Sequence, residues 1–268
     1  MSAEALTLQE TALALGQELG DQRIIATALG RLAHLAFFRT EFERGDAWAA
    51  ASYDQHRSLA DRWGMAFALD ARGLIARSQG RVEDASRYLL GSLSLFREQG
   101  DRWGVAHVLT GLGQLALHRG DHRHAEQCWE ERLRLSRALD NKLGVAHTLD
   151  LLATVARDRG DYPRAETLFA ESLALRRKIG DRQVTAWVLQ GMGELALRRG
   201  DALTAYTHLR ESLLLRVEIA ERPGIVASLV AFARLACGPP PATACPPLRR
   251  CRGCPLPSGW SISCCPAL

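Results

Sequence analysis

The stretch Asp101–Asp140 reads DRWGVAHVLTGLGQLALHRGDHRHAEQCWEERLRLSRALD, and it decides the fold because the chain repeats it. Asp181–Ala220 reads DRQVTAWVLQGMGELALRRGDALTAYTHLRESLLLRVEIA, and the segments 61–100 and 141–180 keep the same register. Self-similarity at a fixed period is the signature of a repeat architecture. The period is about 40 residues, and it organises the chain over residues 1–236.

Each 40-residue unit is expected to form two helices, A and B. Glycine–aspartate pairs separate them, because glycine takes the left-handed conformation beyond a helix end and aspartate caps the next helix start. Such pairs occur at 20–21, 100–101, 120–121, 160–161, 180–181 and 200–201, and variants occur at 40–41, 60–61, 80–81, 140–141 and 220–221. In the unit 101–140, helix A is predicted over about 103–119 and helix B over about 122–139. Connections of two or three residues force antiparallel neighbours.

These elements predict an all-α fold, a right-handed α-solenoid of stacked antiparallel helical hairpins with a disordered C-terminal tail. The predicted boundaries are a half repeat at 1–20, full repeats at 21–60, 61–100, 101–140, 141–180 and 181–220, a half repeat at 221–236 and the tail at 237–268. One helix A position holds small residues, which are Gly73, Gly113, Ala153 and Gly193. A glycine inside a helix costs about 1 kcal/mol relative to alanine, so its recurrence needs a packing reason. Uncapped ends of the array leave room for self-association.

Several repeated residues resemble the tetratricopeptide-repeat signature. They are Leu112, Gly113, Ala116, Gly120, Asp121, Ala125 and Trp129, with Tyr162, Ala165 and Phe169 in the next unit. The resemblance covers residues 3–236 and implies paired helices whose A members line a concave surface. Two features depart from the family pattern. The period is 40 rather than about 34 residues, which implies longer helices, and charged residues such as Arg137 replace the usual proline near the end of helix B.

The segment Glu171–Asp201 looks more narrowly like the sensor arrays of large bacterial regulators. Such regulators carry a nucleotide-binding signal-transduction ATPase before the repeats and often a LuxR-type helix-turn-helix domain after them. The printed sequence has no GxxxxGK[ST] motif and no DNA-reading module. The resemblance therefore implies a sensor or scaffold array, expected to be a fragment of such a regulator.

Composition limits the classes of partner. The sequence is 47% apolar, and no apolar run approaches the roughly 18 residues of a membrane helix, so no membrane association is predicted. All 30 acidic residues and all but three of the 34 basic residues precede residue 237, so the repeats are nearly neutral with interspersed signs. A nucleic-acid surface would cluster lysine and arginine on one face, so direct nucleic-acid binding is not expected. The N-terminus resembles no secretory signal, which makes a cytoplasmic location the expectation.

The composition changes at residue 237. The segment 237–268 holds six of the seven cysteines, eight of the ten prolines and no acidic residue. Two interpretations stay open: out-of-frame translation of a former helix B, and an authentic disordered tail. A zinc site at Cys251, Cys254, Cys264 and Cys265 is not favoured, because adjacent cysteines are a poor second pair for tetrahedral zinc.

No catalytic residue, metal site or cofactor is predicted. The sequence contains no GxSxG, no HExxH and no catalytic cysteine–histidine context, so enzyme activity is not expected. His118, His122 and His124 cluster around one turn and are interpreted as solvated side chains. Arg-Gly-Asp occurs four times and is interpreted as helix caps or as part of a helix.

The concave surface implied by the family resemblance is here called the inner groove. Its predicted members mix aromatic side chains with both signs of charge, which suits an extended peptide or a partner helix. They are His34, Phe37, Phe67, Asp70, Arg77, His107, Thr110, Gln114, His147, Asp150, Arg157, Trp187, Gln190, Glu194 and Arg198. The lysine and asparagine pattern with which chaperone-adaptor members clamp a carboxylate is not present, so that activity is not expected.

The predicted function is a protein–protein interaction scaffold or sensor that binds a partner peptide or helix along the inner groove. Two alternatives stay open. In one, a small-molecule effector binds between hairpins of a regulatory module. In the other, the chain is a truncated product with no activity of its own.

Overall fold

The computed structural model describes residues 3–237, and within that range the fold is entirely helical. The helices are α1 (Ala3–Leu19), α2 (Gln22–Phe38), α3 (Phe42–Ser58), α4 (Arg62–Ser78), α5 (Val82–Glu98), α6 (Arg102–His118), α7 (His122–Ala138), α8 (Lys142–Asp158), α9 (Tyr162–Ile179), α10 (Arg182–Arg199), α11 (Ala202–Glu218) and α12 (Arg222–Cys237). The predicted solenoid of helical hairpins is confirmed, with even-numbered helices in the predicted A positions from α2 onward. Helix α12 includes residue 237, where the tail was predicted to begin, and the other expectations for the tail lie outside the described residues.

Each connection contains one residue in the left-handed conformation. Seven of these residues are glycines. The other four are Thr40, Ala60, Asp140 and Ala220, with φ of 61°, 52°, 48° and 53°. Aspartates then cap the next helix, as where Asp101 Oδ1 accepts bonds of 2.9 Å from the backbone N–H groups of Trp103 and Gly104. The predicted left-handed residue is therefore present in every connection, but the side-chain cap is absent where Glu41 and Arg81 precede α3 and α5.

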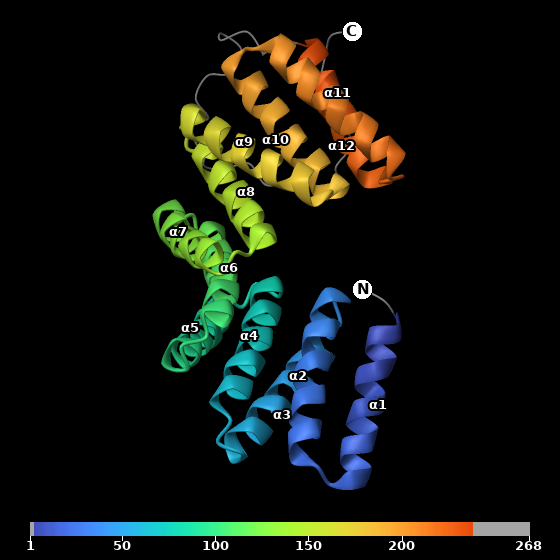
Figure 1. The fold of residues 1–268 in the computed structure, drawn as a ribbon, viewed down its shortest axis with the longest axis vertical. Coiled ribbons are helices and arrows are strands. Elements are labelled where there is room, and N and C mark those ends of the chain that lie inside the picture. The colour runs from blue at the N-terminus through green and yellow to red at the C-terminus, as the bar shows by residue number, and fades with distance from the viewer. Residues whose placement is uncertain (1–2, 238–268) are drawn as a thin grey trace, which may run out of the picture.

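The even-numbered helices form the inner layer of the array. Their backbones approach one another at α2–α4, α4–α6, α8–α10 and α10–α12. Successive odd-numbered helices are instead joined by ion pairs between long side chains. Two of these pairs are Arg97–Glu131 at 2.8 Å and Arg137–Glu171 at 2.7 Å. Figure 1 shows the resulting curved path, with α5 and α7 on its outer side and α4, α6 and α8 on its inner side.

Close approach within each hairpin depends on small residues. A Cβ atom at Gly113 would lie 2.2 Å from Nε1 of Trp129, whose side chain is fully buried. A Cβ atom at Gly73 would similarly lie 2.6 Å from Leu89 Cγ. Close packing against these side chains therefore explains why glycine recurs at this helix A position.

A buried serine ties each odd-numbered helix to the even-numbered helix before it, with one exception. Ser92 Oγ donates to the Ala66 carbonyl at 2.8 Å, and Ser52, Ser172 and Ser212 make the corresponding bond in their own units. At the equivalent position α7 carries Arg132, which reaches forward to α8 and donates to the Gly144 carbonyl at 3.1 Å. The backbones of α6 and α8 are also the one pair of successive even-numbered helices in residues 3–237 that do not approach each other.

Candidate functional site

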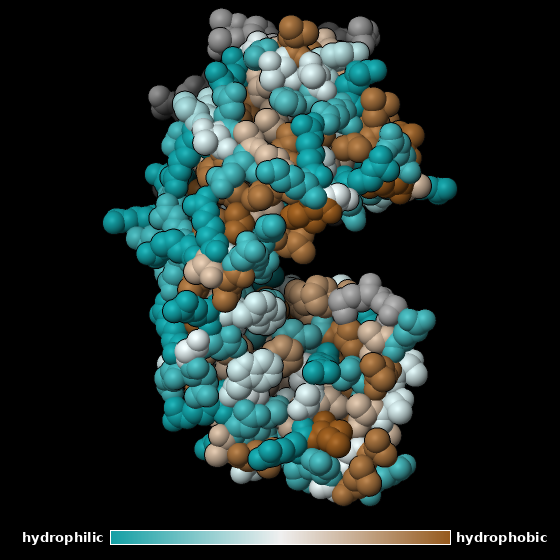
Figure 2. Space-filling view, viewed as in Figure 1, coloured by the Kyte–Doolittle hydropathy of each residue, from teal (hydrophilic) through white to brown (hydrophobic). Residues whose placement is uncertain are grey.

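All fifteen predicted members of the inner groove lie on the even-numbered helices α2, α4, α6, α8 and α10. Because these helices form the inner layer, the predicted residues share one face of the array. Figure 2 shows that the molecule is hollowed on one side, between the half that contains α8–α12 and the half that contains α1–α4. The structure does not make all fifteen equally available. Eleven of them fall into three groups, and Phe37, Thr110, Gln114 and Trp187 lie outside these groups.

The first group joins three helices. His34 on α2, Asp70 on α4 and His107 on α6 meet, with Oδ2 of Asp70 lying 3.1 Å from Nε2 of each histidine. The ring of Phe67 stacks on His34 with the centroids 4.1 Å apart. Residues from three successive units are therefore neighbours across the groove, a contact that the sequence register alone did not reveal.

Asp70 is the buried centre of this group, with only 1% of its side chain exposed. Burial acts to raise its pKa, but the charges and hydrogen bonds of His107 and His34 outweigh burial and hold the pKa well below the usual range. Reciprocally, burial acts against the charged form of His107, but the Asp70 carboxylate raises the His107 pKa. Arg77 adds a further positive charge that interacts with Asp70.

Two exposed tryptophans extend the first group and were missed in the sequence prediction. Trp63 and Trp103 occupy the same position in the first turn of α4 and of α6, and are 45% and 54% exposed. Trp63 stacks on Phe67 and Trp103 stacks on His107, with centroids 5.4 and 5.5 Å apart. Two signals could have identified them: their equivalent positions in successive units, and their places one helical turn before predicted groove members.

The second group lies on α8 and α10 and carries both signs of charge. Arg157 Nη1 donates to Glu194 Oε2 at 3.2 Å, and Gln190 Nε2 donates to Glu194 Oε1 at 3.1 Å. Arg198 is half exposed and lies 3.7 Å from Asp158. These side chains form a polar strip along the groove that could pair with a charged ligand.

The third group is engaged within the fold. Asp150 does not face the groove freely, because Arg176 from α9 donates to its Oδ2 through Nε at 3.0 Å. Burial of Asp150 raises its pKa despite this partner and the hydrogen bond from Ser172. His147 accepts a hydrogen bond of 3.2 Å from Arg132, and burial lowers its pKa to about 4, with Arg132 and Arg176 acting in the same direction. Asp150 and His147 are therefore held by partners within the fold, which leaves them less available to a ligand.

Trp187 on α10 is the most exposed aromatic member of the groove, at 56%. The guanidinium of Arg216 from α11 lies 5.0 Å from its ring centroid, so one face of the indole is supported by a buried cation. Phe37, Thr110 and Gln114 are partly buried on the same layer, and Thr110 donates to the Ala106 carbonyl at 3.3 Å.

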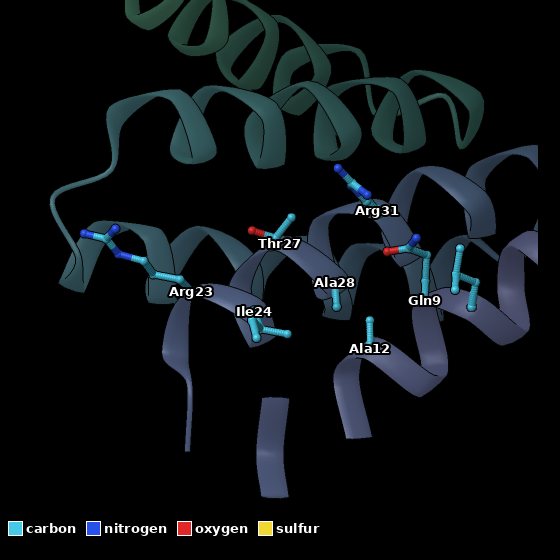
Figure 3. Close-up of a pocket in the computed structure, with 8 residues that line it drawn as sticks. Gln9, Ala12, Arg23, Ile24, Thr27, Ala28 and Arg31 are labelled. Carbon is cyan, nitrogen blue, oxygen red and sulfur yellow. The ribbon is translucent and has the colours of Figure 1, made fainter. Parts of the chain in front are cut away.

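A separate hollow of about 400 Å³ lies between α1 and α2. Figure 3 shows the side chains around it, with Gln9 and Ala12 on α1 and Arg23, Ile24, Thr27, Ala28 and Arg31 on α2. Thr27 occupies the position that Phe67 and His107 hold in later units, so the hollow lies at the α1 end of the inner layer. Its lining combines two arginines with mostly apolar side chains and holds no pair of groups suited to acid–base chemistry.

The three histidines near the turn after α6, which are His118, His122 and His124, do not meet as a group. His118 ends α6, His122 begins α7, and His124 lies with its Nε2 3.8 Å from Sγ of the buried Cys128. Burial raises the pKa of the Cys128 thiol to about 11. Among the described residues no helix combines the length and apolar character that crossing a membrane requires.

The repeat signature is matched by the family model for tetratricopeptide repeats over residues 64–138 and 144–213, which is more than half of the chain. The chain belongs to the tetratricopeptide-repeat family. No curated protein matches it in sequence.

Solved structures share the tetratricopeptide fold at low sequence identity. BtubC from P. vanneervenii is 16% identical, with a TM-score of 0.72 over 82% of this chain and 93% of that one. Aspartyl phosphate phosphatase F from Bacillus subtilis is 11% identical, with a TM-score of 0.65 over 86% of this chain and 64% of that one. A Rap protein crystallised with competence and sporulation factor is 12% identical, with a TM-score of 0.59 over 79% of this chain and 64% of that one. At these identities the similarity shows the fold alone.

Proposed function

We propose that this tetratricopeptide array is a protein-interaction module that holds a peptide or helix of a partner protein along the inner groove. The observation that carries the proposal is the row of exposed tryptophans on the inner layer, namely Trp63, Trp103 and Trp187. Large aromatic side chains are costly to leave in water and are the residues that most often anchor protein interfaces. Each of the three is held in place by a neighbouring ring or cation, so little conformational entropy is lost on binding.

The charged strip on α8 and α10 supports a ligand of fixed orientation. Arg157 and Glu194 present opposite charges on one face, and Arg198 with Asp158 repeats this at the end of the helices. A partner segment with both signs of charge would pair with this strip while its apolar side chains contact the tryptophans. We assign the module no catalytic step.

The wider role that we propose is the scaffold or sensor portion of a bacterial regulator. The resemblance of Glu171–Asp201 to such arrays supports this role. It is further supported by analogy with the similar Rap protein, which was crystallised with a competence and sporulation factor.

Peptide selection followed by calorimetry tests the groove. Peptides would be selected from a random display library on the full chain, and the affinity of the best peptide would then be measured for each variant. Trp103→Ala should weaken binding by about 30-fold, corresponding to the roughly 2 kcal/mol of an interface hot spot. Leu90→Ala is the matched control, because Leu90 is 51% exposed on α5 in the outer layer, and it should leave the affinity unchanged.

Two results would contradict the proposal. One is a selected peptide whose affinity is the same for Trp103→Ala, for Trp187→Ala and for the parent chain. The other is a loss of affinity in Leu90→Ala that equals the loss in Trp103→Ala. Circular dichroism of each variant separates a lost contact from lost folding.

A further inference from the structure

His34, Asp70 and His107 form a cluster that the peptide-binding proposal does not use. One potential ligand atom of each residue lies within 4.8 Å of those of the other two, and Nε2 of each histidine lies 3.1 Å from Oδ2 of Asp70. They come from α2, α4 and α6, three successive helices of the inner layer. No metal site was predicted from the sequence, where only histidines close together along the chain stand out.

The hydrogen bonds around His34 determine which of its nitrogens is free. Nδ1 lies 3.1 Å from the carbonyl oxygen of Gly30, and a carbonyl oxygen can only accept. Nδ1 therefore carries the hydrogen, and in the neutral ring Nε2 presents a lone pair. That lone pair faces Oδ2 of Asp70 at 3.1 Å, so two acceptors face each other unless a cation lies between them.

Asp70 has unused capacity to bind a cation. Its side chain is 1% exposed, and Oδ1 has no hydrogen-bond partner among the described residues. A buried carboxylate with an unpartnered oxygen is unfavourable, because the oxygen has lost its water without replacement. A cation bound at the cluster would compensate this charge directly.

The spacing of the donor atoms fits a tetrahedral metal. Zinc lies about 2.0–2.1 Å from a histidine nitrogen and about 2.0–2.2 Å from a carboxylate oxygen, which separates neighbouring ligands by about 3.3 Å. The two observed separations from Asp70 are 3.1 Å each. Two imidazoles and one carboxylate suit zinc and similar transition metals rather than calcium or magnesium, which prefer oxygen ligands.

The surrounding residues hold both rings in a fixed orientation. The bond from His34 to Gly30 is the kind of outer contact that orients a metal-binding histidine. Phe67 stacks on the ring of His34, and Trp103 stacks on that of His107 with an angle of 7° between the planes. His107 is 43% exposed, which leaves one side of the cluster open to water for a fourth ligand.

We propose that His34, Asp70 and His107 bind one zinc-like divalent transition metal ion on the inner layer, with the fourth position open to the groove. The metal would link three successive helices of the inner layer through one ion. Arg77 and Arg132 carry positive charge that interacts with Asp70 and with His107 respectively, so the site should bind more weakly than a zinc site made of thiolates. The proposal does not depend on peptide binding.

Zinc titration of the full-length chain tests the site. Cysteines also bind zinc, so every sample would carry serine in place of the six cysteines of the segment 237–268, which are Cys237, Cys245, Cys251, Cys254, Cys264 and Cys265. Calorimetry with zinc alone should show one equivalent bound to this parent chain. His107→Gln should bind at least tenfold more weakly, and it should fold normally because His107 is partly exposed. His118→Gln, which changes an exposed histidine outside the cluster, should bind like the parent.

X-ray absorption at the zinc edge supplies a readout that does not depend on affinity. The expected spectrum shows nitrogen and oxygen neighbours at roughly 2.0–2.2 Å and no sulfur neighbour at roughly 2.3 Å. A sulfur neighbour would place the zinc at Cys128 and overturn the proposal. So would equal affinity in the parent and in His107→Gln, or binding weaker than millimolar, and the bridging cation at His34 would then be a proton.

Discussion

At the scale of single residues, the most unusual backbone belongs to the connections that lack glycine. Ala60 has φ of 52°, a conformation in which a residue with a Cβ atom is less stable by about 1–2 kcal/mol. Its side chain is exposed, so the methyl group makes no packing contribution that a glycine would remove. The strain at this position is therefore not offset by a local contact.

We expect Ala60→Gly to raise the free energy of unfolding by about 0.5–1 kcal/mol, because relief of strain exceeds the added entropy of the unfolded chain. The midpoint of urea unfolding measures the change. Ala51→Gly provides the matched control, since Ala51 is exposed inside α3 and the same replacement there should lower stability by about 1 kcal/mol. A lower midpoint for Ala60→Gly than for the parent would contradict the expectation.

His147 makes stability depend on pH. Burial lowers its pKa in the folded chain to about 4, whereas the unfolded chain should titrate near 6.5. Between these values the unfolded state binds more protons than the folded state, so stability is complete above about pH 6.5 and falls as the pH drops toward 4. The contribution lost should be on the order of 2–3 kcal/mol.

His147→Gln tests this dependence. Glutamine keeps an acceptor for Arg132 but has no proton to gain, so the decline in urea midpoint between pH 7 and pH 4 should be shallower than in the parent. Other groups titrate in both chains, and the difference between the two curves isolates His147. Parallel curves would show that His147 does not contribute.

At the scale of helices, the crossing of α6 and α7 depends on the missing side chain of Gly113. A methyl group there would overlap the indole of Trp129, which is fully buried and has no room to move outward. Gly91 in α5 offers the contrast, because a Cβ atom there would meet only Leu69 Cδ1, at 3.3 Å.

We expect Gly113→Ala to lower stability by about 1–3 kcal/mol through overpacking, and Gly91→Ala to be neutral or stabilising by up to about 1 kcal/mol through helix propensity. Thermal unfolding followed by circular dichroism compares the two. If both replacements raise the melting temperature, the close crossing at Gly113 is not the reason for its glycine.

The helices themselves were largely predictable from the sequence. The turn residues recur every 20 positions, and the expected ends of α6 and α7 at 103, 119 and 139 differ from the observed ends by one residue. Propensity could not identify turns such as Thr40 or Ala60, but the repeat register placed them. The register predicts these turns because each unit repeats the same packing, so the neighbouring residues impose the turn conformation on an atypical residue.

At the scale of the whole molecule, each unit within residues 3–237 contacts only adjacent units, so stability should be local. The loss caused by Gly113→Ala should therefore appear in hydrogen exchange as faster exchange of peptides from about 101–140, with peptides from about 181–220 unchanged. A uniform loss of protection along the array would instead indicate a single cooperative unit.

The contacts between units were the part of the site that the sequence did not predict. Register placed His34, Asp70 and His107 on one layer, but their meeting depends on the offset between successive helices, which no spacing within one helix reports. Asp150 was predicted as a groove residue, yet Arg176 reaches it from the neighbouring helix α9. Long side chains that cross between helices follow from packing in three dimensions and not from periodicity.

The short connections between the helices also bear on proteolysis. A protease needs a flexible, extended segment, and a connection of two or three residues between packed helices supplies none. Arg119 lies in such a connection, where its backbone N–H is bonded to the Leu115 and Ala116 carbonyls. Tryptic cleavage within residues 3–237 must therefore wait until a hairpin opens. The rate at which each arginine is cut would then report how often its own unit unfolds.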